Sequence, residues 1–290
     1  MSEYKVIKNY RNDDVLRGSF NELAKNTFGI DFEDWYQNGY WTDNYNPYSI
    51  VLDGKVVANV SVNRTDFEWN GEIKHFIQLG TVMTDEDYRN RGLIRKIMEE
   101  IDADYEGKVD GVYLFANNEV LNFYPKFGFT TIKQYEYVKE VQNTLDATAE
   151  KVDMSSKDHW DRLQELIENS YHQSTFEMVD NSGLNMFYVS KFMQDCVYYC
   201  ADSDVYVIAE IEDGEMILNM VISKKEVDMN KVIEAFGREI SSVVLGFTPK
   251  DTTGFTVREM DQDDSTMHVK GIGWQGFEED ALMVPLLAHA

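Results

Sequence analysis

Two hairpin turns followed by an amphipathic helix constrain this chain more than any other feature of its sequence. Asp53-Gly54 and Asn70-Gly71 each separate two runs of strand character, and such pairs supply the positive φ angles of two-residue turns. The helix predicted over residues 93–105 shows one apolar stripe, and the short strand VDGVYLFA follows it. An antiparallel meander that enters a right-handed crossover predicts an α/β (α+β) fold, with a mixed central sheet flanked by helices.

The length of 290 residues predicts two domains. Apolar periodicity is lost over residues 142–156, so we expect domains at 1–145 and 146–290. Further expected elements are helices over 13–27, 118–127, 157–171 and 230–240, strands within FTTIKQYEYVKEV that close the first unit, and a final pair near 267–273 and 282–287.

A weak internal sequence repeat relates the two halves of the chain. Gly54 is followed five residues later by Asn59, and Gly214 is followed at the same distance by Asn219, each in an Asp-Gly hairpin. This pattern indicates a diverged duplication.

The charge of the chain narrows its partners. Asp and Glu total 52 against 27 Lys and Arg, a formal net charge of −25 that repels nucleic acid and anionic membranes and attracts cations. Solubility in a cytoplasm is an alternative reason for this charge. The polar N-terminus and the lack of a long apolar run predict a cytoplasmic protein without membrane contact. Cys196 and Cys200 could share a helix face and are expected to be free thiols, with no metal site.

A charged turn before the predicted helix is the strongest functional signal. A strand ends, Gly92 precedes the helix, and Arg89, Arg91 and Arg95 add positive charge to an acidic protein. A helix start offers unpaired N–H groups and the positive end of the dipole, which suits a pyrophosphate. The alternative is a solvated helix start whose arginines pair with nearby acids.

Two motifs carry a resemblance to a known family. Arg89-x-x-Gly92-x-Ile94 resembles the Arg/Gln-x-x-Gly-x-Gly/Ala motif of GNAT acetyltransferases, with Ile94 departing from the pattern. The aliphatic pair after the glycine is similar to the Eis-like branch. The second family signature is matched by the run from Asn117 through Phe123-Tyr124 to GF at 128–129.

The resemblance implies a GNAT fold that uses acetyl-CoA, followed by a second, degenerate GNAT-like domain and no sterol-carrier-like domain. It makes Tyr124 the general acid that protonates the departing thiolate, and a backbone N–H near Met83 the donor to the oxyanion. In Eis-like proteins the terminal carboxylate, here that of Ala290, reaches the site. The implied cofactor-binding residues are Val82, Met83 and Thr84 toward pantetheine, Arg89, Asn90, Arg91, Gly92, Leu93, Ile94 and Arg95 around the pyrophosphate, and Asn117 on the pantetheine arm.

The acceptor is expected to be an amine, by resemblance, and a cationic one. The region between the first helices and the meander combines carboxylates with aromatic faces, which suit an amine cation such as an aminoglycoside, a polyamine or a lysine side chain. A catalytically silent GNAT protein that binds acetyl-CoA or a protein partner is the alternative; transfer of an aminoacyl group from tRNA is disfavoured by the charge. The general base (Ala290, an acid or water), a homo-oligomer and the role of 146–290 stay open. The aromatic residues and carboxylates of the expected acceptor region are Phe28, Phe32, Trp35, Tyr36, Tyr40, Trp41, Tyr45, Tyr48, Asp31, Glu33, Asp34 and Asp43.

Overall fold

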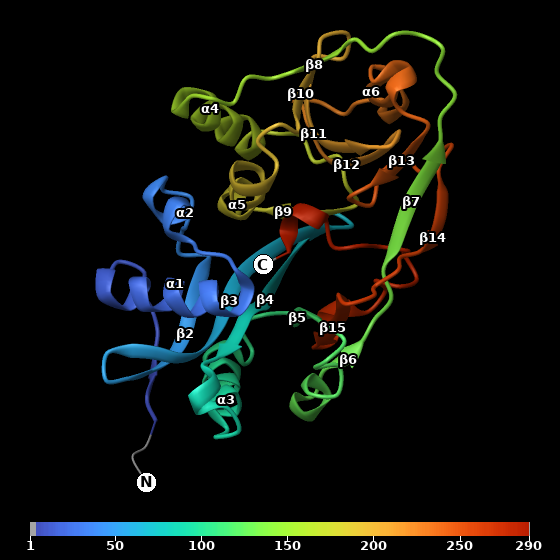
Figure 1. Ribbon diagram of the computed structural model, residues 1–290. Helices are drawn as coiled ribbons and strands as arrows, with labels where there is room; N and C mark the ends of the chain where they lie inside the picture. Colours follow the sequence, from blue (N-terminus) through green and yellow to red (C-terminus); the bar gives the residue numbers. More distant parts are fainter. Residues whose placement is uncertain (1–3, 290) are drawn as a thin grey trace.

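The computed structural model describes residues 4–289 and arranges them in two lobes, each built on one mixed sheet (Figure 1). The first sheet has the order β1-β2-β3-β4-β5-β15-β6, and β9 pairs with the end of β3. Its strands are β1 (Val6–Ile7), β2 (Tyr45–Leu52), β3 (Lys55–Trp69), β4 (Glu72–Thr84), β5 (Gly111–Ala116), β6 (Thr130–Thr131), β9 (Phe176–Val179) and β15 (Thr266–Lys270).

The predicted meander and crossover are confirmed. Asp53 and Asn70 adopt φ values of 49° and 55°, followed by glycines at 78° and 77°, as two-residue hairpin turns require. β4 runs parallel to β5, with helix α3 (Leu93–Tyr105) between them in the sequence.

Helices cover both faces of the first sheet. Successive strand residues point to opposite faces, and Val56 packs in the cluster of α1 (Asp14–Phe28), whereas Val57 packs in that of α3. The carboxylate of Asp13 caps α1 by accepting from the N–H groups of Val15 and Leu16. A short helix, α2 (Glu33–Gln37), follows α1.

The second sheet has the order β14-β7-β13-β12-β11-β10-β8. Its strands are β7 (Tyr135–Glu140), β8 (Ala149–Lys151), β10 (Val197–Cys200), β11 (Val205–Glu212), β12 (Glu215–Ile222), β13 (Ser242–Leu245) and β14 (Thr256–Glu259). The helices of this half are α4 (Lys157–Glu168), α5 (Ser182–Phe192) and α6 (Met229–Glu234), and the 3₁₀ turns of the chain are η1 (Glu86–Tyr88), η2 (Tyr124–Phe127), η3 (Gly237–Glu239), η4 (Ile272–Trp274) and η5 (Leu286–Ala288).

Apart from β9, the strands of the two sheets correspond one to one. Read from β1 and from β8, the third and fourth strands are antiparallel, the fourth and fifth are parallel, and the sixth runs antiparallel to the fifth. In both sheets the sixth strand comes from the other half of the chain: β15 lies between β5 and β6, and β7 lies between β13 and β14. The long crossing of β7 and β14 into the second lobe is visible in Figure 1.

This exchange corrects the prediction that FTTIKQYEYVKEV closes the first unit. Only Thr130–Thr131 joins the first sheet; Tyr135–Glu140 pairs in the second. Strand propensity does not say which of two similar sheets receives a strand. The internal repeat at Gly54 and Gly214 also joins turns that are not structurally equivalent. The turn of Gly214 connects β11 and β12, which correspond to β3 and β4, and the turn between β3 and β4 is Asn70-Gly71.

Three local predictions also fail. Residues 118–127 form turns and η2 rather than an α-helix, because Pro125 has no N–H to donate to the carbonyl of Leu121 and its ring obstructs an α-helix through this segment. Cys196 and Cys200 share no helix: Cys200 lies in β10, and both thiols are free. The segment 282–287 forms no strand and enters η5. None of the helices between residues 4 and 289 is long and apolar enough to cross a membrane.

The strand exchange makes the first half dependent on the second. We expect a fragment of residues 1–145 to lack cooperative unfolding, because without β15 the strands β5 and β6 lose their shared partner. Urea unfolding followed by far-UV circular dichroism measures this, with the intact chain and a co-refolded mixture of 1–145 and 146–290 as controls. A sharp transition of the isolated fragment, with the m-value of its size, would contradict the expectation.

Candidate active site

The strands β4 and β5 separate at the centre of the first sheet. Their parallel pairing covers Phe76 to Gln78 against Gly111 to Tyr113. Beyond this point β4 continues to Thr84 along β3, while β5 continues along β15. The edge of β4 from Leu79 onward therefore faces a gap, where an extended chain with amide groups can pair with its backbone.

A bulge in β4 marks the start of this gap. The register with β3 shifts between Asn59 and Ser61, and Thr81 adopts a φ of 47°. A β-branched residue with positive φ is strained, so surrounding contacts must hold it. The Nδ2 of Asn59 donates to the Thr81 carbonyl at 2.9 Å, and the hydroxyls of Tyr45 and Thr81 share a hydrogen bond of 2.6 Å.

A buried polar chain extends this support to the N-terminal segment. The hydroxyl of Ser49 donates to Oδ1 of Asn59 at 2.8 Å and shares a 2.6 Å hydrogen bond with Tyr10. Ser49 and Asn59 are fully buried. Because these polar groups find partners, their hydrogen bonds offset the cost of burying them and the network holds the bulge in place.

The start of α3 lies at the far end of the gap. Gly92 has a φ of 74°, and a Cβ built there would meet no atom of the described chain within 4 Å. Within residues 4–289 no side chain caps this helix start, and its first turn carries no acid. The site is therefore open, backbone-lined and without negative side chains in the first helical turn, as an anion requires.

The three arginines surround this turn at its surface. Arg89 lies 3.5 Å from Glu86, and Nε donates to the Thr84 carbonyl at 3.4 Å. Arg91 donates to the Asp87 carbonyl at 2.6 Å, and the Arg95 guanidinium lies 5.2 Å from the Phe127 ring centroid. The ion pair between Arg89 and Glu86 is exposed and weak, so the guanidinium of Arg89 can bind a phosphate in place of Glu86.

One cavity of about 610 Å³ adjoins the bulge and joins several predicted residues. Val82 of β4, Ile94 of α3, Asn117 after β5 and Tyr124 of η2 all line it. Its other lining residues are Phe28, Ile30, Phe32, Trp35, Tyr45, Leu79, Gly80, Thr81, Phe115, Val120, Phe123, Leu184, Phe187, Tyr188 and Phe192.

Tyr124 is buried at this cavity, against the rings of Phe123 and Phe129. Burial raises the pKa of its hydroxyl to about 12. The phenol is therefore protonated at neutral pH. The side chain of Asn117 accepts from the N–H of Glu119 at 3.2 Å, which shapes the turn after β5.

Other predicted residues do not line this cavity. The side chain of Met83 is buried in the aromatic cluster beside α1, and that of Leu93 in the core beneath α3. Thr84, Asn90 and the arginines lie along the path from the bulge to the helix start, outside the cavity. Asn90 has a φ of 62°, which lets the chain turn before Gly92.

The sequence did not reveal the wall supplied by the second half. α5 contributes Leu184, Phe187, Tyr188 and Phe192 to the cavity. The Nε1 of Trp35 donates to the Gly183 carbonyl at 2.7 Å, which ties this helix to the first lobe. The available signal was a helix that is apolar on nearly all sides, GLNMFYV, which indicates burial against more than one element.

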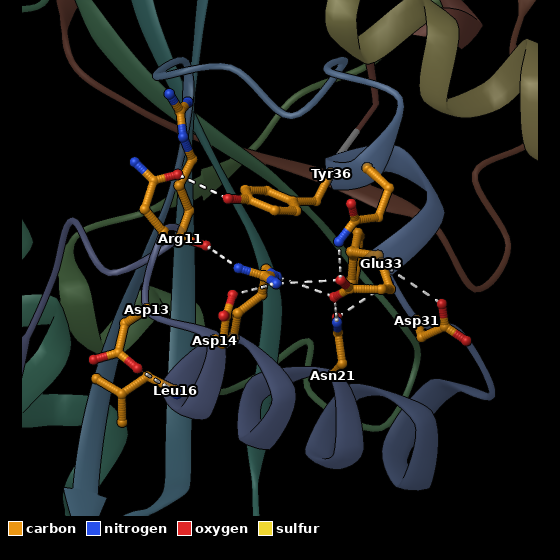
Figure 2. A network of polar contacts seen from close by, with 12 residues as sticks. Arg11, Asp13, Asp14, Leu16, Asn21, Asp31, Glu33 and Tyr36 are labelled. Atoms are coloured by element: carbon orange, nitrogen blue, oxygen red, sulfur yellow. Dashed lines mark hydrogen bonds and ion pairs between the residues drawn. The ribbon is translucent and has the colours of Figure 1, made fainter.

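The acids expected beside the aromatic residues are engaged elsewhere. Glu33 receives hydrogen bonds from Arg17 at 3.0 Å and Asn21 at 3.1 Å, and Figure 2 shows this network beside α1. Asp43 pairs with Arg11 at 3.0 Å. The carboxylate of Asp31 lies 3.9 Å from the ammonium of Lys191, and Asp34 lines a different, polar cavity.

The end of the described chain also reaches the cavity wall. The ring of His289 stacks on Phe115 at 3.9 Å, and burial lowers the pKa of His289 to about 4. Ala290, whose carboxylate was one candidate base, lies outside the described residues.

The corresponding place in the second lobe is built differently. After the parallel pairing of β12 and β13, the Leu286 N–H donates to the Gly246 carbonyl at 2.9 Å, so η5 lies where the first lobe has its gap. A Cβ at Gly246 would lie 3.2 Å from the Leu286 side chain. The helix between β12 and β13, α6, is capped by the carboxylate of Asp228, which repels an anion.

Comparison with known proteins agrees with this geometry. The family model for the GNAT acetyltransferase domain matches residues 8–132. No curated protein matches the chain. Residues 8–132 of this chain therefore form a GNAT acetyltransferase domain.

Solved structures are similar over both lobes. A probable N-acyltransferase from Enterococcus faecalis V583 has 17% identity and a TM-score of 0.61, with 96% of this chain and 74% of that chain covered. Eis1 from Mycobacterium abscessus has 11% identity and a TM-score of 0.55, with 91% and 73% covered. A GCN5-related N-acetyltransferase from Kribbella flavida has 14% identity and a TM-score of 0.54, with 93% and 72% covered. The likeness establishes an Eis-like fold.

The bulge predicts a measurable role for Asn59. Replacing Asn59 by Ala removes the hydrogen bond to the Thr81 carbonyl and should lower the free energy of unfolding by about 1–3 kcal/mol. In calorimetry it should also weaken the binding of acetyl-CoA, the cofactor that the match to the GNAT domain implies. Asn219→Ala, which removes a buried amide from the second lobe, is the control and should change stability alone. Equal effects of both variants on binding would contradict this role of Asn59.

The Glu33 network predicts a specific pH dependence. The hydrogen bond from Arg17 holds the pKa of Glu33 below its ordinary value of 4.5, so ionised Glu33 stabilises the fold. This stabilisation is complete above pH 4.5 and is lost as pH falls through the folded-state pKa. We expect Glu33→Gln to lower stability at pH 7 by about 1 kcal/mol, because solvent screens the partly exposed carboxylate, and the difference from wild type to shrink as pH falls below 4.5. Thermal unfolding across this pH range tests it; a constant difference would contradict it.

Proposed function

We propose that this protein is an acetyl-CoA-dependent N-acetyltransferase that acts on the primary amine of a cationic acceptor, a small molecule or a lysine side chain. One observation carries the proposal: Val82, Ile94, Asn117 and Tyr124, from four separate segments, line a single cavity at the β4 bulge. A strand edge, a helix start and a protonated phenol are thereby available along one path. These are the groups that acyl transfer from a thioester to an amine requires.

The residues along this path fit acetyl-CoA. The open space at Gly92 and the uncapped start of α3 suit its pyrophosphate, and Arg89, Arg91 and Arg95 supply charge. Bound there, the cofactor would supply an activated acetyl group as a thioester. The residues that would hold it are Val82, Met83, Thr84, Arg89, Asn90, Arg91, Gly92, Leu93, Ile94, Arg95 and Asn117.

Each proposed role follows from a property of the residue. The edge of β4 near Met83, which has no β5 partner, offers backbone N–H groups to the oxygen that gains negative charge. Tyr124 is protonated at neutral pH and donates to the departing sulfur. The attacking amine must be neutral, and no residue is assigned as its base.

Acetyl-CoA should stabilise the protein measurably. At about 100 times Kd, binding adds about 2.7 kcal/mol, which raises the melting temperature by several degrees for a chain of this size. Gly92→Glu should abolish the rise, because it adds a carboxylate and a side chain at positive φ to the phosphate site.

Gly107→Glu is the matched control for this test. Gly107 has a φ of 69° and equally open surroundings, but lies at the far end of α3, about 20 Å away for a helix of this length. It should show the same loss of stability as Gly92→Glu while retaining the response to acetyl-CoA. If acetyl-CoA raised the melting temperature of both variants by the same amount, or of neither, the assigned site would be contradicted.

Tyr124→Phe separates catalysis from binding. We expect turnover, measured by thiol release, to fall by about 100-fold, in the range of general acid catalysis, with the acetyl-CoA thermal shift unchanged. Tyr137→Phe in the second lobe is the control and should retain full turnover. Acetyl-CoA binding without turnover in the wild type would instead favour a catalytically silent binding protein.

A further inference from the structure

The cavity at the bulge continues into an aromatic chamber formed by both lobes. The segment from α1 to α2 supplies Phe28, Phe32 and Trp35, and α5 supplies Phe187, Tyr188 and Phe192. The rings of Phe32 and Phe187 stack at 5.4 Å, and that of Trp35 meets Phe187 edge-on at the same distance. Asn117 and Ile94, which belong to the proposed cofactor path, line the same cavity.

The chamber has an apolar mouth. Phe28 and Phe192 are 48% and 52% exposed, although both line the cavity. Single exposed apolar residues are ordinary, but two aromatic rings at the opening of one apolar cavity indicate a surface that receives an apolar body.

No charged side chain of the described residues lines the chamber. The acids nearest in sequence face other partners or another cavity. Glu33 pairs with Arg17 (Figure 2), the carboxylate of Asp31 lies 3.9 Å from the ammonium of Lys191, and Asp34 lines a separate polar cavity. A ligand with several charges would therefore enter without counterions.

Charge solvation then decides which amine can bind. Moving an isolated ammonium from water into an apolar cavity costs several kcal/mol of solvation free energy, and this cost falls when the ammonium is deprotonated to the neutral amine. Loss of one proton also yields the neutral amine that acyl transfer needs. A polyamine or an aminoglycoside would have to desolvate or neutralise further charges that take no part in the reaction.

We propose that the acceptor is an amphiphilic monoamine: one primary amine on an aromatic or aliphatic body, without a second charged group. This inference rests on the proposed function and narrows its acceptor. The apolar body occupies the aromatic chamber, and the amine points toward Thr81 and Tyr124. The nitrogen forms a bond to the acetyl carbon, the carbon–sulfur bond breaks, the nitrogen loses a proton and the sulfur gains one.

Two amines of equal length test the proposal on the intact protein. Hexylamine and 1,6-diaminohexane differ by one terminal ammonium, and 2-phenylethylamine and spermidine extend the comparison. With acetyl-CoA and thiol-release detection, we expect kcat/KM for hexylamine to exceed that for the diamine by about 100-fold, because burial of a second charge is costly. Equal or better turnover of the diamine or of spermidine would overturn the proposal.

A charge placed in the chamber gives a second readout. Phe192→Asp, at the exposed mouth, should reduce the hexylamine-to-diamine ratio at least tenfold by supplying a counterion. Ile272→Asp adds the same charge at a residue that is 80% exposed outside the cavity, and should leave the ratio unchanged. An unchanged ratio in Phe192→Asp would contradict the assigned chamber.

Failure of this inference is distinguishable from failure of the proposed function. Calorimetry of the amines needs no turnover, so tighter binding of hexylamine supports the chamber even in a silent protein, and failure of every amine to bind overturns it. If kcat/KM rose with the length of the acyl chain on CoA but did not depend on which amine was used, the chamber would bind the acyl group, and the proposal would be overturned. Absence of any acetyl-CoA thermal shift overturns the proposed function alone.

Discussion

The exchange of β7 and β15 between the two sheets is the constraint on which the rest of the structure depends. Each sheet is complete only with a strand from the other half, so the lobes are held against each other by backbone hydrogen bonds. β9 adds a further link by pairing with the end of β3. This arrangement brings α5 against the first lobe, where the bond from Trp35 to the Gly183 carbonyl fixes it and closes the aromatic chamber.

Within the first lobe, the bulge at Thr81 sets the geometry of the site. It lies just beyond the last paired residues of β4 and β5, so the strained residue and the opening of the gap coincide. Strain of this kind persists only when neighbouring groups hold it, and Asn59 and Tyr45 do so through buried hydrogen bonds. The second lobe keeps the same strand order, but η5 and the carboxylate of Asp228 take the corresponding places. One fold therefore provides an open site in one lobe and a filled one in the other.

The limits of sequence-based prediction are visible at particular residues. The turns at Asp53-Gly54 and Asn70-Gly71 were predictable because their φ values follow from local residue chemistry. The segment before Gly128 was mistaken for a helix because its apolar spacing concealed the effect of Pro125. The strand Tyr135–Glu140 was recognised as a strand but assigned to the wrong sheet, since its pairing partners lie about 100 residues away along the chain.

The sequence by itself determined the meander, the crossover, the charged turn around Gly92 and the two motifs of the GNAT family, because all of these arise from contacts and backbone preferences within short segments. Only the tertiary structure decided which strand completes which sheet, that Thr81 is held in a bulge, and that α5 forms a wall of the cavity. It also decided that Glu33 pairs with Arg17 and Asp43 with Arg11 rather than lining the chamber. These outcomes depend on long-range pairing and on competition among buried groups for partners, which no local pattern encodes.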